Sequence, residues 1–215
     1  MENDYIDITY PISSRLPKWH GSIGFEAKWH MQMPSDTNNL SSFTIDSHLG
    51  THLDAPLHFV HDSKAIHEMD LNKLIGKTYV AEIRGLKSIT ANDLENANIP
   101  ANCTKLLLKT DNQLYWEQGL TEFQEDFSSI DVTGAQWVID RGIHLIGIDY
   151  LSIQRFHDGP ETHQLLLQNE VVIVETLNLE QVEPGWYDLI CLPLKLEGLE
   201  GSPVRAILKK IKTYD

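Results

Sequence analysis

The sequence has little of what several large classes of protein depend on. Its 2 cysteines, Cys103 and Cys191, lie far apart and form no CxxC pair, so we expect two small buried side chains rather than a disulfide framework. No apolar run approaches the roughly 18 residues that indicate a membrane-spanning helix. The acidic start, MENDYIDITYPIS, lacks the basic and apolar regions of a signal peptide. These absences favour a cytoplasmic protein.

Positive charge is also scarce. Lys and Arg total 17 against 31 Asp and Glu, which gives a formal net charge of −14. A surface of this sign repels polyanions, so nucleic acid and anionic membranes are excluded as expected partners. The carboxylates that remain are available for metal binding or for solvation of the surface.

What is present is a mixture of strand and helix signals in a chain of 215 residues, 41% of them hydrophobic, which suits one domain over residues 1–215. Apolar runs at 105–110 and 144–149 flank a helix expected at 131–141, an order that predicts a right-handed βαβ crossover. Thr90 is expected to cap another helix, with Asp93 three residues on. The fold class is α/β with a mixed sheet. The other expected strands are 5–12, 24–33, 78–84, 171–177, 185–194 and 203–211, and a further helix is expected at 163–168.

The densest group of metal-ligand side chains lies in SHLGTHLDAPLHF, residues 47–59. Gly50 and Pro56 oppose a helix here. In an extended segment the even-numbered positions point one way, which puts His48, His52, Asp54 and His58 on one face and the leucines at 49, 53 and 57 on the other. Two neutral imidazoles and a carboxylate on one face are suitable ligands for Zn²⁺ or another divalent cation. The hydroxyls of Ser47 and Thr51 are expected to orient the rings.

A catalytic metal site keeps a position for water, so a further protein ligand should come from elsewhere in the chain. Candidates are His144, His157, His163 and nearby carboxylates. Glu175 interrupts the apolar strand VVIVETL, and a buried carboxylate is costly unless it is paired or bound to metal.

The run HLGTHLDAPLH resembles the HxGTHxDxPxH signature of the cyclase-like metal-dependent hydrolases, which include bacterial kynurenine formamidases. The likeness continues through DFSSIDVTGAQWVIDRGIHLIGIDYLSI, HQLLLQNEVVIVETLNL and LPLKLEGLEGSPVRAIL, and so covers nearly the whole chain. The resemblance implies a swivelling β/β/α domain, assembled as a homodimer or homotetramer. It also implies a small-molecule substrate and two divalent metals, Zn²⁺ or Mn²⁺, in each subunit.

By position, the resemblance assigns His48 and His52 to the first metal and lets Asp54 contact both. It assigns His163 to the second metal and makes Glu175 a bridge. His58 is implied as the proton-transfer residue, and Trp19 as an aromatic lining of the substrate pocket. Those residue roles come from the resemblance; the spacing alone indicates only the first cluster.

Two departures from the family pattern bear on the substrate. Trp19 is followed by His20, Gly21 and Ser22 where family members often have Pro-Gly-Asp, and Gln154 stands where an Asp is frequent. The leading expectation is hydrolysis of an amide such as an N-formyl arylamine. Hydrolysis of a cyclic amide or lactone, such as an isatin-like ring, and a non-catalytic metal-binding role are the alternatives.

Overall fold

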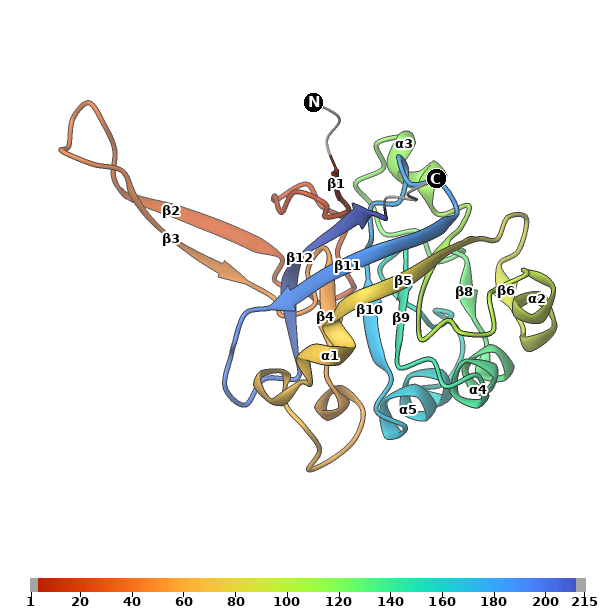
Figure 1. Cartoon of the computed structure of the whole chain (residues 1–215). Coiled ribbons are helices and arrows are strands. Elements are labelled where there is room, and N and C mark those ends of the chain that lie inside the picture. Colours follow the sequence, from red (N-terminus) through yellow and green to blue (C-terminus); the bar gives the residue numbers. More distant parts are fainter. Residues whose placement is uncertain (1–3, 212–215) are drawn as a thin grey trace.

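The protein is described by a computed structural model that covers residues 4–211. Its main feature is an eight-stranded mixed sheet in the order β1-β12-β11-β5-β7-β9-β10-β4 (Figure 1). Strand β4 pairs with β10 on one side and with β12 on the other, so the sheet closes like a barrel. The strands are β1 (Tyr5–Asp7), β4 (His52–Asp54), β5 (Ile75–Glu82), β7 (Lys105–Lys109), β9 (Leu145–Ile148), β10 (Val172–Glu175), β11 (Gly185–Pro193) and β12 (Gly201–Lys210).

The parallel part of the sheet follows the predicted βαβ order. Strands β5, β7, β9 and β10 run parallel, and helix α4 (Val132–Asp140) lies in the chain between β7 and β9. Asp131 caps α4 by accepting a hydrogen bond from the backbone of Gly134. Thr90 caps α2 (Ala91–Asn96) in the expected capping box with Asp93. The α/β class with a mixed sheet is therefore confirmed.

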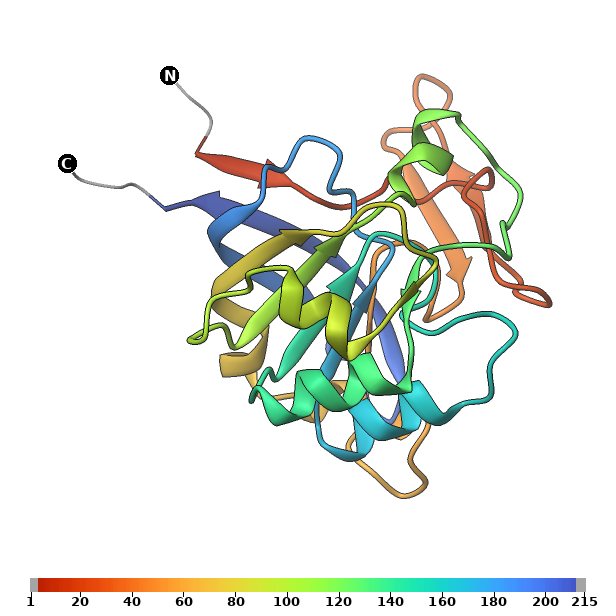
Figure 2. The same cartoon turned by 90° about the vertical axis from the view of Figure 1, so that its right-hand side faces the viewer.

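Two apolar cores follow from the alternation of side chains along the strands. Leu107 of β7 points into the barrel, whereas its neighbours Leu106 and Leu108 pack in the outer core beneath the helices. Helices α4 and α5 (Glu161–Gln168) lie side by side on that outer surface (Figure 2). Both cysteines are free and buried, as expected. The short elements are α1 (Leu71–Leu74), α3 (Gln113–Glu117), β6 (Ser88–Ile89), β8 (Ser129–Ile130) and the 3-10 helices Pro56–His58 and Ile66–Glu68.

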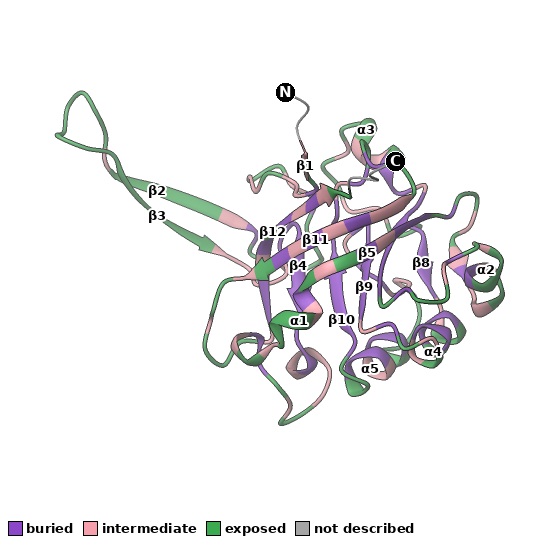
Figure 3. Ribbon diagram, in the orientation of Figure 1, coloured by how far each residue is buried: buried purple, intermediate pink, exposed green. Residues whose placement is uncertain are grey.

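A second feature is a hairpin of β2 (Phe25–Met31) and β3 (Leu40–Ile45), which forms a two-stranded sheet of its own. It projects from the barrel, and its residues are mostly exposed (Figures 1 and 3). We call residues 25–45 the arm.

Strand β1 is shorter than the expected strand 5–12. It ends at Asp7, before Pro11, which has no N–H to donate to a sheet.

Within residues 4–211, no helix is long and apolar enough to cross a membrane.

Candidate metal centre

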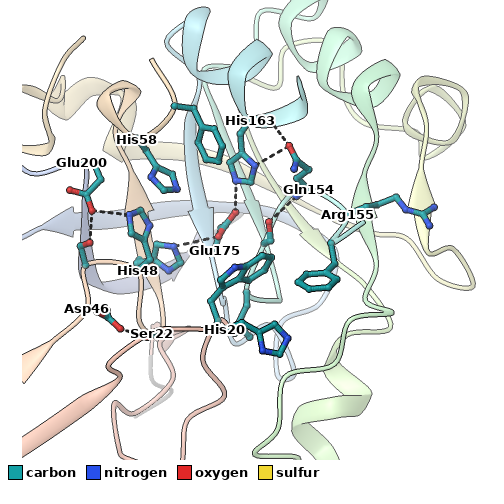
Figure 4. Close-up of a pocket in the computed structure, with 17 residues that line it drawn as sticks. His20, Ser22, Asp46, His48, His58, Gln154, Arg155, His163, Glu175 and Glu200 are labelled. Carbon is teal, nitrogen blue, oxygen red and sulfur yellow. Dashed lines mark hydrogen bonds and ion pairs between the residues drawn. The ribbon is translucent and has the colours of Figure 1, made fainter. Parts of the chain in front are cut away.

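A cavity of about 470 Å³ opens at one end of the barrel, and six of the seven sequence-predicted site residues line it (Figure 4). These are Trp19, His48, His52, His58, His163 and Glu175. The seventh, Asp54, is fully buried behind His48 and His52 and contacts both. The structure therefore brings together residues from four separate segments of the chain.

Strand β4 supplies the centre of this site. His52 and Asp54 are two residues apart on one face, and Leu53 between them is buried in the barrel core. The antiparallel register with β10 places Glu175 directly opposite His52. The predicted alternation of side chains is therefore confirmed within β4, which contains only these three residues.

Strand alternation does not extend to the ends of the motif, where Gly50 and Pro56 interrupt the extended segment. His48 precedes the strand and is turned inward at Gly50, whose φ of 71° suits a glycine. His58 follows Pro56 in a 3-10 helix rather than an extended segment. Leu57 is accordingly only partly buried, whereas the prediction placed it in the core. Both histidines still reach the cavity, by turns instead of by strand alternation.

Asp54 lies at the middle of the cluster. Its Oδ1 is 3.0 Å from Nδ1 of His48 and 3.4 Å from Nε2 of His52, and its Oδ2 is 3.7 Å from Nε2 of His163. Glu175 spans two histidines, with Oε2 3.4 Å from Nε2 of His52 and Oε1 3.3 Å from Nε2 of His163. One buried carboxylate thus faces three imidazoles and the other faces two.

The residues present fit divalent cations. Nε2 of His52 and Oδ2 of Asp54 are buried without a hydrogen-bond partner, which is costly unless something else satisfies them. His52, Asp54 and Glu175 offer ligand atoms within 4.8 Å of one another, and so do His48, Asp54 and His58. Imidazole nitrogens mixed with carboxylate oxygens are the donors that Zn²⁺ and similar cations take.

The histidines are oriented by acceptors on their far sides. Nδ1 of His52 donates to the carbonyl of Gly50 at 2.8 Å, which leaves Nε2 facing the carboxylates. Nδ1 of His163 donates to Oε1 of Gln154 at 3.2 Å, with the same result. Such contacts fix the ring and the tautomer of metal-binding histidines. Gln154 therefore lines the cavity, where it was expected to bear on the substrate, and also contacts a histidine of the cluster.

The hydroxyls of Ser47 and Thr51 donate their hydrogen bonds to other groups and not directly to the rings, contrary to expectation. The Ser47 hydroxyl donates to Glu200. The Thr51 hydroxyl donates at 2.6 Å to the carbonyl of Thr176, the residue after Glu175. Thr176 has a φ of 58°, an uncommon conformation for a β-branched residue, so this hydrogen bond helps to hold a strained turn beside the cluster.

The charges of the cluster stabilise one another. Burial opposes ionisation of Asp54, but the hydrogen bond with His48 and the contact with His52 hold its pKa well below the usual range. For Glu175, burial and the nearby Asp54 raise the pKa, but the contacts with His163 and His52 lower it by more, so the pKa stays below the usual value. Burial lowers the pKa of His52, yet its contacts with both carboxylates raise it to about 10. Both carboxyl groups are therefore held in the ionised form that a cation needs.

His58 has the opposite character. Burial lowers its pKa to about 4; the attraction of Asp54 opposes this shift, and the neighbouring His48 and His163 add to it. Its ring stacks on His48 with centroids 4.0 Å apart. At neutral pH it is therefore an uncharged imidazole at the cavity wall.

One side of the cavity is aromatic. Trp19 is 41% exposed, and its ring centroid lies 4.9 Å from that of Phe123 and 5.3 Å from that of Phe156. Phe59 stacks on His163 with centroids 4.5 Å apart. Phe59 and Phe156 line the cavity but were not predicted, because an isolated Phe in a sequence does not differ from a core residue.

Two of the histidines considered as further ligands fall outside the cluster. His157 is largely exposed and pairs with Glu125 at 3.5 Å, and His144 begins the segment that leads into β9. Of the three histidines considered as a further ligand, His163 is the one that the fold brings to Asp54.

Comparisons with known proteins agree with this geometry. The family model described as "Putative cyclase" matches residues 6–155. "Cyclase-like protein 3" of Oryza sativa subsp. japonica is 39% identical over 95% of this chain and 79% of its own length. "Kynurenine formamidase" of Bacillus cereus is 32% identical over 97% of this chain and 99% of its own. A solved structure described as a potential metal-dependent hydrolase with cyclase activity is similar at a TM-score of 0.82 and 29% identity, covering 97% of this chain and 98% of that one. With a matching family model over most of its length and relatives above 30% identity, the chain belongs to the cyclase family.

Proposed function

We propose that this protein is a metal-dependent hydrolase that cleaves an amide such as an N-formyl arylamine. The observation that carries the proposal is Asp54, a buried ionised carboxylate between three histidines at the bottom of an aromatic-walled cavity. The kynurenine formamidase relatives and the structural similarity to a metal-dependent hydrolase support the same chemistry.

The cluster would hold two divalent cations, Zn²⁺ or Mn²⁺. His48, His52 and Asp54 would hold one, and Asp54, His163 and Glu175 the other. When bound, such cations polarise a carbonyl group and lower the pKa of bound water from 15.7 to about 7.

His58 would move the proton. An arylamine nitrogen is a poor leaving group as an anion, so it must be protonated as its bond to the carbonyl carbon breaks. The uncharged His58 can accept a proton from water at one step and deliver it to this nitrogen at the next. Its stacking on His48 holds the ring beside the reacting group.

Trp19 would bind the aryl part of the substrate. Its ring borders the cavity together with Phe156, on the side formed by the loops rather than by the barrel. Stacking on this wall would direct the carbonyl toward Asp54 and leave polar ring substituents near the mouth.

We also propose that the chain assembles as a homodimer or homotetramer, and the arm supports this. The register of the hairpin gives it one uncharged face and one polar face: Phe25 lies opposite Ile45 and Ala27 opposite Phe43, whereas Glu26 lies opposite Thr44. Phe43 is 63% exposed and Trp29 is 55% exposed. An uncharged face on a chain of net charge −14 is a surface through which two copies can meet without repulsion.

The experiment that tests the proposed reaction is metal analysis of the purified protein, coupled to assays on formanilides, cyclic imides and lactones. Hydrolysis of formanilides that depends on Zn²⁺ or Mn²⁺ is the expected result. Metal binding with turnover of cyclic substrates alone would contradict the proposed substrate class, and metal binding without any hydrolysis would contradict the enzyme assignment.

A further inference from the structure

His48 is held from two sides. Its Nδ1 lies 3.0 Å from Oδ1 of Asp54. Its Nε2 lies 3.2 Å from Oε1 of Glu200 (Figure 4). Glu200 is 152 residues away in the sequence and comes from the loop before β12. Each ring nitrogen of His48 therefore has its own carboxylate.

Glu200 is itself fixed in place. The Ser47 hydroxyl donates to its Oε1 at 2.6 Å, and its backbone carbonyl accepts a hydrogen bond from the N–H of Ala55 at 2.8 Å. The next residue, Gly201, pairs with Asp54 in the antiparallel ladder of β12 and β4. Both the side chain and the backbone of Glu200 are thus hydrogen-bonded to the segment that carries the cluster.

Gly201 makes room for the ring. A Cβ atom at this position would lie 2.7 Å from Cε1 and 2.9 Å from Nε2 of His48, closer than side chains approach one another. Gly201 therefore leaves space for the His48 ring, and Glu200 beside it offers an acceptor to the ring's Nε2.

We propose that Glu200 is a positioning residue that orients His48 toward Asp54. This inference rests on the proposed function, in which His48 holds one of two cations. Histidines that bind metal commonly donate their other ring N–H to a carboxylate, and Glu200 stands where that partner belongs. Glu200 is not itself a ligand: among residues 4–211 it belongs to neither group of ligand atoms within 4.8 Å, and Oε1 is occupied by Ser47 and His48.

The test compares Glu200→Ala, Glu200→Gln and the control Glu197→Ala, which removes an exposed carboxylate from the same loop. Binding of Zn²⁺ to metal-stripped protein is measured by titration against a chelator, and thermal unfolding checks the fold. We expect Glu200→Ala to weaken one of two binding steps by roughly 10- to 100-fold. Glu200→Gln, which keeps an acceptor oxygen, should recover most of this affinity, and Glu197→Ala should match the wild type.

A second readout needs no metal. Long-range ¹H–¹⁵N spectra of the metal-free protein should show the His48 Nε2 signal shift in Glu200→Ala and return toward its wild-type position in Glu200→Gln. Wild-type protein that binds no cation would contradict the proposed function, while these spectra would still decide the role of Glu200. Unchanged spectra and affinity in Glu200→Ala would overturn the inference, as would a Glu200→Gln variant as impaired as Glu200→Ala, which would make Glu200 a ligand.

Discussion

The barrel end and the arm depart from the usual distribution of side chains in opposite ways. The barrel end buries the charged groups Asp54 and Glu175, which soluble proteins keep at the surface unless they are paired. The arm exposes Trp29 and Phe43, which soluble proteins usually cover. We propose that each departure serves binding, of cations in the first region and of a second copy of the chain in the other. The two regions should therefore respond separately to substitution.

The largest effect is expected at the centre of the cluster. Asp54→Ala removes the carboxylate that faces three histidines, so we expect loss of bound metal and of all measurable turnover, without loss of assembly. Metal content by mass spectrometry, turnover and light scattering check the three outcomes. Asp62→Ala, which removes an exposed carboxylate in the next loop, is the matched control. A fully metal-loaded Asp54→Ala variant would contradict the proposed ligand set.

The next effect separates chemistry from metal binding. His58→Ala should keep its metal and lose about 10²- to 10⁴-fold in kcat, the usual contribution of a positioned proton-transfer group. His61→Ala, three residues on and with a side chain 91% exposed, should leave kcat unchanged. Loss of metal from His58→Ala would show that this imidazole is a ligand instead.

Substitutions in the arm should change assembly without changing metal binding at the barrel end. Phe43→Asp places a charge in the uncharged face, and we expect association to weaken by roughly 100-fold, the cost of disrupting a buried contact. Thr44→Asp adds the same charge to the polar face and should assemble like the wild type. Light scattering over a range of concentrations measures both, and metal content should be normal in each. A wild-type protein that is monomeric at all concentrations would refute the proposed assembly.

The smallest effect compares two tryptophans. Trp19→Ala should raise KM for an aromatic substrate by roughly 2- to 10-fold, with little change in kcat. This rise in KM corresponds to the loss of an aromatic contact of about 0.5–1.5 kcal/mol. Trp29→Ala, in the arm, should leave KM unchanged and weaken assembly. Steady-state kinetics on formanilides distinguish the two, and equal KM values for wild type and Trp19→Ala would remove Trp19 from the proposed substrate site.

The parts of the molecule that depend on local sequence could be predicted. Thr90 and Asp131 begin helices because their side chains cap neighbouring N–H groups, and His52 and Asp54 share a face because side chains alternate along a strand. Residue chemistry made His163 and Glu175 candidates, but no spacing connects them to residues 48–58, and their roles at the metals came from the resemblance.

The rest depends on contacts between distant segments. Glu200 reaches His48 only because β12 pairs with β4, and an acidic residue in a loop carries no signal of such a partner. The arm was predicted only as a strand at 24–33, since the pairing of β2 with β3 and the absence of a covering layer are properties of the folded chain.

The most direct test of the account is anomalous diffraction from crystals grown with Mn²⁺ or Zn²⁺. The account predicts two peaks that share the Asp54 carboxylate, one also bound by His48 and His52 and the other by His163 and Glu175. Crystals with no anomalous peak at Asp54, although the cation is present in excess, would contradict it.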